Sequence, residues 1–213
     1  VRRLAEIFLE LQGQKAANIN LVTPTHYTPQ IIRAVELARN QGLMVPIVYN
    51  CSGYEKVDTL KMLEGIVDVY LTDFKYMETE LAAKYSHAAD YPRVAKAALA
   101  EMVRQMEMHG ARAERQEETM HGAGAERQKE TMHGVGAARA GAAFDEGGMM
   151  QKGVIVRHLL LPGHLQNAKK VVYYVYRAYG NRVYLSLMNQ YTPMQEKKEI
   201  FERNGWPQMN RRV

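Results

Sequence analysis

The chain has 213 residues, of which 46% are hydrophobic and 24% are charged, so size and composition predict one globular domain with a hydrophobic core. The same composition argues against a collagen, a coiled coil and a wholly disordered chain. We find no run of about 18 apolar residues and no charged leader before an apolar stretch, so we expect no membrane span, no secretory signal and a cytoplasmic location.

The charge balance points to small anions rather than to nucleic acid. The 28 basic and 23 acidic residues leave a net charge of +5, which favours the approach of an anionic cofactor. Lys and Arg are spread over every segment instead of clustering with aromatic residues, so we expect no nucleic-acid partner. The only cysteine, Cys51, excludes an internal disulfide framework and a metal cluster held by thiolates of this chain alone.

Hydrophobic spacing predicts helices and strands in alternation. Thr28 is expected to cap a helix with Pro29 at its first position, and Gly42 to stop it. In chain order the sequence predicts a helix ending at Gly13, a strand at 19–22, the helix from Thr28, a strand at 45–49, a helix at 56–64, a strand at 66–71, a helix around Leu81, a longer helix from Tyr91, a strand at 154–161, a helix ending at Gly180 and a strand at 183–188.

This alternation is typical of βαβ units. The strands are nearly continuous apolar runs, as in a parallel sheet that is covered on both faces or closed into a barrel. The sequence therefore predicts the α/β class, and a mixed α+β domain remains the alternative.

Residues 108–143 interrupt the alternation with three copies of a twelve-residue repeat that begins Met-His-Gly. The repeat has almost no large aliphatic residues, so we expect a solvated insertion that is partly helical or disordered. Its histidines, His109, His121 and His133, would lie about 120° apart on a continuous helix, which argues against a metal site. A tandem duplication of coding DNA explains the repeat.

Polar side chains follow each predicted strand, at the edge where ligands bind in parallel α/β folds. Lys75 and Arg157 need a negatively charged partner at this edge, because a cation there loses part of its hydration. That partner is either an anionic ligand or the carboxylate of Asp73. Of the neighbours Arg157 and His158, one at most should face the interior. The residues after the strands are Thr23, Thr25 and His26; Asn50, Cys51 and Ser52; Asp73 and Lys75; Arg157 and His158; and Asn189, Gln190 and Tyr191.

Six strings carry a family resemblance: NINLVTPTHYTPQI, VPIVYNCSGYE, VDVYLTDFKYM, KYSHAADYPRVAKAAL, GVIVRHLLLPGH and YLSLMNQYTPM. Together they resemble the radical S-adenosylmethionine proteins related to pyruvate formate-lyase activating enzyme, over most of residues 1–107 and 149–195. The resemblance implies a partial (β/α)6 barrel with a [4Fe-4S] cluster that reductively cleaves S-adenosylmethionine to a 5′-deoxyadenosyl radical. It also implies hydrogen abstraction from a substrate, which in the activating enzymes is a glycine of a partner protein.

The chain departs from that family at the cluster. The family holds its cluster with a CxxxCxxC loop after the first strand, and this sequence has no such loop. The resemblance thus implies one truncated barrel domain over residues 1–213, lacking the first strand and carrying the insertion at 108–143, with no metal ligands and no activity of its own. Two alternatives stay open: a non-catalytic remnant that binds at most a nucleotide-like ligand, and a phosphate-binding barrel enzyme that acts through Lys75 and Arg157.

The resemblance also implies cofactor contacts. Asp73 and Lys75 in DFKYM resemble the family's DxK, whose lysine meets the cofactor carboxylate, and Arg157 resembles an arginine near the cofactor. Asn50 and Ser52 resemble a polar pair beside the ribose. The remaining candidates are Thr25 and Asn189. Thr25 lies in the loop that stands where the family has a GGE-like loop in contact with the cofactor's amino group, and Asn189 lies at the end of the last strand.

Overall fold

The structure is a computed structural model, and it describes residues 1–120 and 142–189. Within the first range, side chains are described up to Met108. No helix in these two ranges is both long and apolar enough to cross a membrane.

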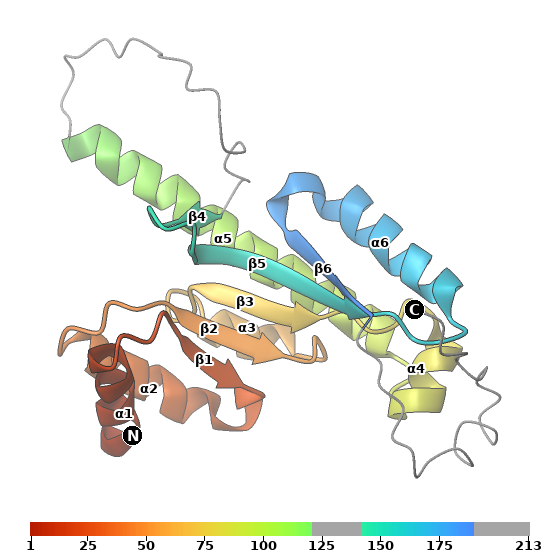
Figure 1. Ribbon diagram of the computed structural model, residues 1–213, viewed down its shortest axis with the longest axis horizontal. Helices are drawn as coiled ribbons and strands as arrows, with labels where there is room; N and C mark the ends of the chain where they lie inside the picture. The colour runs from red at the N-terminus through yellow and green to blue at the C-terminus, as the bar shows by residue number, and fades with distance from the viewer. Residues whose placement is uncertain (121–141, 190–213) are drawn as a thin grey trace.

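A six-stranded, mostly parallel sheet organises the described chain (Figure 1). Its parallel strands lie side by side in the order β1 (Ile19–Val22), β2 (Ile47–Cys51), β3 (Val69–Asp73), β5 (Met150–Leu159) and β6 (Tyr184–Met188). The short β4 (Ala143–Phe144) pairs antiparallel with the first residues of β5. All five parallel strands therefore end at the same edge of the sheet, to which their arrows point in Figure 1.

One helix precedes β1, and the others lie in the connections between successive parallel strands, with two of them between β3 and β5. The helices are α1 (Arg2–Gly13), α2 (Thr28–Arg39), α3 (Val57–Met62), α4 (Thr79–Ser86), α5 (Tyr91–Met120) and α6 (Leu165–Tyr179), with short 3-10 turns η1 (Pro24–Tyr27) and η2 (Gly180–Arg182). In Figure 1, α3 and α5 pass behind the sheet, and the far end of α5 extends beyond the amino end of β5.

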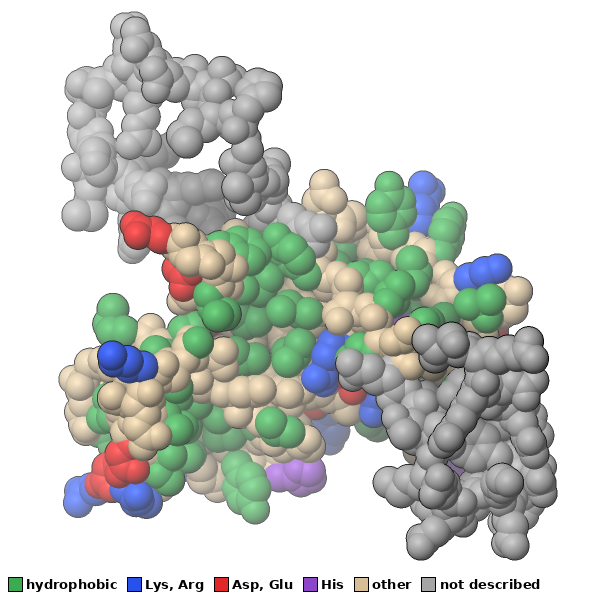
Figure 2. Space-filling model, in the orientation of Figure 1, with side chains coloured by type: hydrophobic (Ala, Val, Ile, Leu, Met, Phe, Trp, Pro, Cys, Tyr) green, Lys and Arg blue, Asp and Glu red, His purple; other side chains and the backbone are tan. Residues whose placement is uncertain are grey.

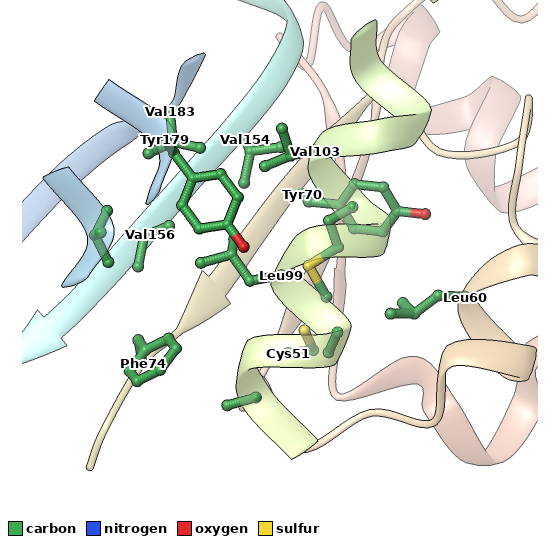
Figure 3. Close-up of a cluster of buried hydrophobic side chains, with 14 of the residues drawn as sticks. Cys51, Leu60, Tyr70, Phe74, Leu99, Val103, Val154, Val156, Tyr179 and Val183 are labelled. Atoms are coloured by element: carbon green, nitrogen blue, oxygen red, sulfur yellow. The ribbon is translucent and has the colours of Figure 1, made fainter. Parts of the chain in front are cut away.

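Two hydrophobic clusters join the helices to one face of the sheet. The smaller packs α1 and α2 against β1 and β2, with Ile19, Val35 and Ile47 at its centre. The larger packs α3 to α6 against β2, β3 and β5; Figure 3 shows part of it, with Tyr70, Leu99 and Val154 among its labelled side chains. Because side chains alternate along a strand, the residues between these core positions point to the other face of the sheet.

The predicted α/β class is confirmed, with differences at element boundaries. The predicted strands at 45–49, 66–71 and 183–188 begin too early, and the one at 154–161 begins too late, because β5 starts at Met150. Ile66 and Val67 are buried in a turn in which both amides bond to Leu63 O, and not in β3. Thr28 is not the cap of α2 but its first residue, and its hydroxyl donates to Thr25 O at 2.9 Å. The two-residue β4 was not predicted, since two residues give no periodicity.

The repeat is in part helical, as expected. Its first copy, residues 108–119, continues α5, which ends at Met120, so the long helix and the predicted insertion overlap. Residues 121–141, which include His121 and His133, lie outside the described residues, as does the side chain of His109.

Candidate functional site

Three candidate residues meet at the carboxyl ends of neighbouring strands. Arg157 on β5 donates from Nε to Asp73 Oδ1 on β3 at 2.9 Å, and from Nη2 to Asn50 Oδ1 on β2 at 2.8 Å. Asp73 and Arg157 are register partners, and Asn50 pairs with Leu71 one step earlier on the same face. The sheet register therefore brings together residues that are up to 107 positions apart in sequence.

Lys75 completes this group, which we call the strand-end cluster: Asn50, Asp73, Lys75 and Arg157. Its Nζ lies 3.7 Å from Asp73 Oδ2, an ion pair longer than a hydrogen bond, and 42% of the Lys75 side chain is exposed. Two cations share one carboxylate, so the cluster has one excess positive charge. Asp73 is the internal partner of Arg157, and Lys75 remains the accessible cation. Figure 2 shows basic and acidic atoms together at this end of the sheet.

The β2–α3 loop packs closely against Asp73. Gly53 has φ +77°, and a Cβ at this position would lie 2.1 Å from Asp73 O, so only glycine allows the approach. The hydroxyl of Tyr91 donates to Ser52 O at 2.8 Å and accepts from the Lys75 amide at 3.0 Å. Ser52 thus neighbours the cluster through its carbonyl, while its hydroxyl accepts a 3.5 Å bond from the Tyr54 amide.

Thr25 belongs to a different network. Its hydroxyl donates to the Glu55 carboxylate, at 2.9 and 3.0 Å to the two oxygens, and lies 3.1 Å from the Tyr49 hydroxyl. Glu55 is buried, and that burial raises the pKa of its carboxyl group. Sequence reasoning missed Glu55, although it stands at the end of the string VPIVYNCSGYE, because nothing in the spacing indicated that the carboxylate is buried.

The loop that carries Thr25 also contains a strained residue. Thr23, directly after β1, adopts a left-handed conformation with φ 50°, which is uncommon for a β-branched side chain. It bonds through its amide to Asn50 O at 2.8 Å, which ties the loop to β2. We find no functional contact for Thr23 among the described residues.

His158 and Arg157 point to opposite faces, as predicted. His158 is 1% exposed on the helix-covered face, and its Nδ1 lies 2.7 Å from Phe74 O. Asn189 follows β6 and is exposed, and Gln190 and Tyr191 lie outside the described residues.

The residues of this chain do not fit an iron-sulfur cluster. Cys51 is 2% exposed, faces the core, and bonds to Thr72 Oγ1 at 3.5 Å. Burial raises the pKa of its thiol to about 12, so it is a thiol and not the thiolate that iron requires. Within the described residues no group of three or more His, Cys, Asp or Glu is arranged to hold a metal ion.

Comparisons with known proteins give one distant relative. No protein-family model matches the chain, and no solved structure matches it. The uncharacterized protein MJ0674 of Methanocaldococcus jannaschii is 26% identical over 200 residues, which cover 92% of this chain and 42% of that protein. The chain therefore spans less than half the length of the curated relative that it matches.

Proposed function

We propose that these residues form part of a radical S-adenosylmethionine protein of the kind related to pyruvate formate-lyase activating enzyme, with the parallel sheet as part of a (β/α) barrel. In this proposal the strand-end cluster binds the amino-acid end of S-adenosylmethionine. The observation that carries the proposal is the convergence of Asn50, Asp73, Lys75 and Arg157 at the carboxyl ends of three neighbouring parallel strands. The family-like strings support it, because three of the six contain the residues of this cluster.

The chemistry of the cluster suits a carboxylate ligand. Lys75 is a compact cation with only a 3.7 Å ion pair to Asp73, so a ligand carboxylate can take the Nζ hydrogens. Asp73 and Asn50 hold the guanidinium of Arg157 in place, so its charge adds to the attraction without reorganisation. Asn50 uses its Oδ1 for Arg157, which leaves its amide nitrogen to donate to a ligand oxygen.

The proposal for this chain is limited to binding. A [4Fe-4S] cluster supplies the electron for cofactor cleavage in this family, and Cys51 is unsuited to hold one, so we assign no cleavage step to these residues. A protein partner of the glycyl-radical type remains an expectation from the resemblance. The second candidate function, a non-catalytic protein that binds a nucleotide-like ligand, is favoured by the same burial of Cys51.

Calorimetric titration with S-adenosylmethionine tests the proposal. We expect the wild-type chain to bind, and Lys75→Gln or Arg157→Gln to weaken the affinity about tenfold, as for a lost charge-assisted contact. Lys61→Gln is the matched control, because Lys61 is an exposed lysine on α3 whose Nζ lies 3.9 Å from Asp58. Absence of binding by the wild type, or an unchanged affinity of Lys75→Gln, would contradict the proposal.

A further inference from the structure

The irregular segment after β3 carries Lys75 and is held by buried side chains from three other elements. We propose that one of these, Asn167 near the start of α6, is a positioning residue for Lys75. This inference rests on the proposed function, because it concerns how Lys75 is presented to the amino-acid end of the ligand.

Asn167 makes two hydrogen bonds to the backbone of this segment. Its Nδ2 donates to Lys75 O at 3.0 Å, and its Oδ1 accepts from the Met77 amide at 2.8 Å. Asn167 is 2% exposed, so both bonds are shielded from water and are costly to break. A single amide side chain thus satisfies the carbonyl of the candidate ligand-binding residue and the amide two residues later.

The side chains on either side of Lys75 fix its direction. Phe74 and Tyr76 are both buried in the larger core cluster, and the Tyr76 hydroxyl lies 3.0 Å from Ser86 Oγ. Because side chains alternate along an extended segment, Lys75 points away from the core and toward Asp73. The bond from Asn167 to Lys75 O sets how far this segment lies from α6, and hence where Nζ stands.

Three further bonds hold the same stretch from other elements. His158 on β5 bonds to Phe74 O at 2.7 Å, and the Tyr91 hydroxyl on α5 accepts from the Lys75 amide at 3.0 Å. The Phe74 amide also donates to Arg157 O at 2.8 Å. Hydrogen bonds to other elements therefore hold each residue from 74 to 77, although this segment belongs to no helix or strand and has no hydrogen-bond ladder of its own. Such support is expected where a side chain must be held ready for a ligand.

A double-mutant cycle with two ligands separates positioning from a merely structural role. The ligands are S-adenosylmethionine and 5′-methylthioadenosine, which lacks the amino-acid group that Lys75 would contact. We expect Asn167→Ala to weaken binding of S-adenosylmethionine about tenfold and binding of 5′-methylthioadenosine by less than about twofold. In the Lys75→Gln background, Asn167→Ala should change neither affinity by more than about twofold, because the two residues act through one contact.

Gln105 provides the matched control. It is a fully buried amide side chain on α5 that donates to Leu60 O at 2.8 Å and accepts from the Tyr70 hydroxyl at 2.7 Å, among residues that do not belong to the strand-end cluster. Gln105→Ala should lower the melting temperature as Asn167→Ala does, and leave the ratio of the two affinities unchanged. If Asn167→Ala does not fold, Asn167→Ser, which retains a hydroxyl, takes its place in the cycle.

Equal losses for both ligands, or additive effects of Lys75→Gln and Asn167→Ala, would overturn the inference. If the wild type binds neither ligand, the proposed function fails. The two hydrogen bonds of Asn167 to the segment that carries Lys75 are then tested in the ligand-free protein. There we expect Asn167→Ala to accelerate hydrogen exchange of the Met77 amide at least about tenfold relative to Gln105→Ala. An unchanged exchange rate at Met77 would contradict the role of Asn167 independently of any ligand.

Discussion

His158 is a buried residue with one ring nitrogen satisfied and the other not. Its Nδ1 donates to Phe74 O, and its Nε2 has no hydrogen-bond partner in the part of the chain that the structure describes. Burial lowers the pKa of the imidazole, because a charged ring would be desolvated there without a counter-ion. The folded protein therefore holds His158 neutral.

We predict that this residue makes folding stability depend on pH. The unfolded imidazole has a pKa of about 6.5 and the folded one a lower pKa, so between these values the unfolded state binds more protons. The free energy of unfolding should be highest above about pH 6.5 and fall as the pH decreases through that value toward the folded pKa. Urea unfolding at several pH values between 7.5 and 5.5 measures the loss.

Two variants isolate the contribution of His158 in that experiment. His158→Gln removes the titrating ring and should flatten the pH dependence, although the protein is less stable overall. His87→Asn changes an exposed histidine at the end of α4 and should leave the wild-type pH dependence intact. A His158→Gln protein that loses stability with pH as the wild type does would count against this assignment.

The candidate site shows which residues sequence patterns can place. Asp73, Asn50 and Arg157 were predictable, because each lies at or within two residues of the carboxyl end of an apolar strand, and parallel strands end at one edge. Glu55 and Asn167 were not, because each is a polar residue in a loop or helix whose burial depends on packing between elements distant in sequence. Thr25 follows the first strand, as predicted, but its bond to Glu55 could not be read from spacing.

At the level of elements, apolar runs predicted where strands exist better than where they begin. Ile66 and Val67 lie in the turn after α3, where Ile66 is buried in the smaller cluster and Val67 in the larger one, and a single sequence does not distinguish this from strand burial. The same limit applies to α5. Its helical spacing is strong up to Met106, where the residues are buried, and the helix then continues into the first repeat copy, which has no apolar stripe.

The repeat should therefore tolerate a change in copy number. Deleting residues 120–131 removes one whole copy and leaves Met-His-Gly directly after the first copy, because the third copy begins with the same residues. A shorter connection between α5 and β4 changes the closure free energy by only about 0.6 kcal/mol for each twofold change in length. We expect cooperative thermal unfolding with a melting temperature close to that of the wild type.

A substitution in the packed part of α5 gives the contrast. Leu99 is 1% exposed. It lies in the buried cluster that Figure 3 shows, and Leu99→Ala should lower the free energy of unfolding by about 2–5 kcal/mol. If the deletion of residues 120–131 destabilises the protein as much as Leu99→Ala does, the repeats contribute to the folded core and the expectation from their composition is wrong.

For the whole molecule, the sheet has an open edge at β1. In the described residues β1 pairs only with β2, and the sheet order places β1 at the end. Backbone groups on the outer side of a four-residue parallel edge can pair with another strand, and Val22 on this strand is 68% exposed. Neither a bulge nor a charged side chain on Ile19–Val22 opposes such pairing.

This edge leads us to expect self-association of the isolated chain. Light scattering during size-exclusion chromatography should show species larger than one chain, increasing with protein concentration. Val22→Lys places a charge on the edge strand and should shift the distribution toward the monomer, because the charge would be buried by a second strand. Met44→Lys is the control, since Met44 is 85% exposed but precedes β2 and lies off the edge strand. A single monomeric species at all concentrations, or equal effects of the two lysine substitutions, would show that the β1 edge is not the associating surface.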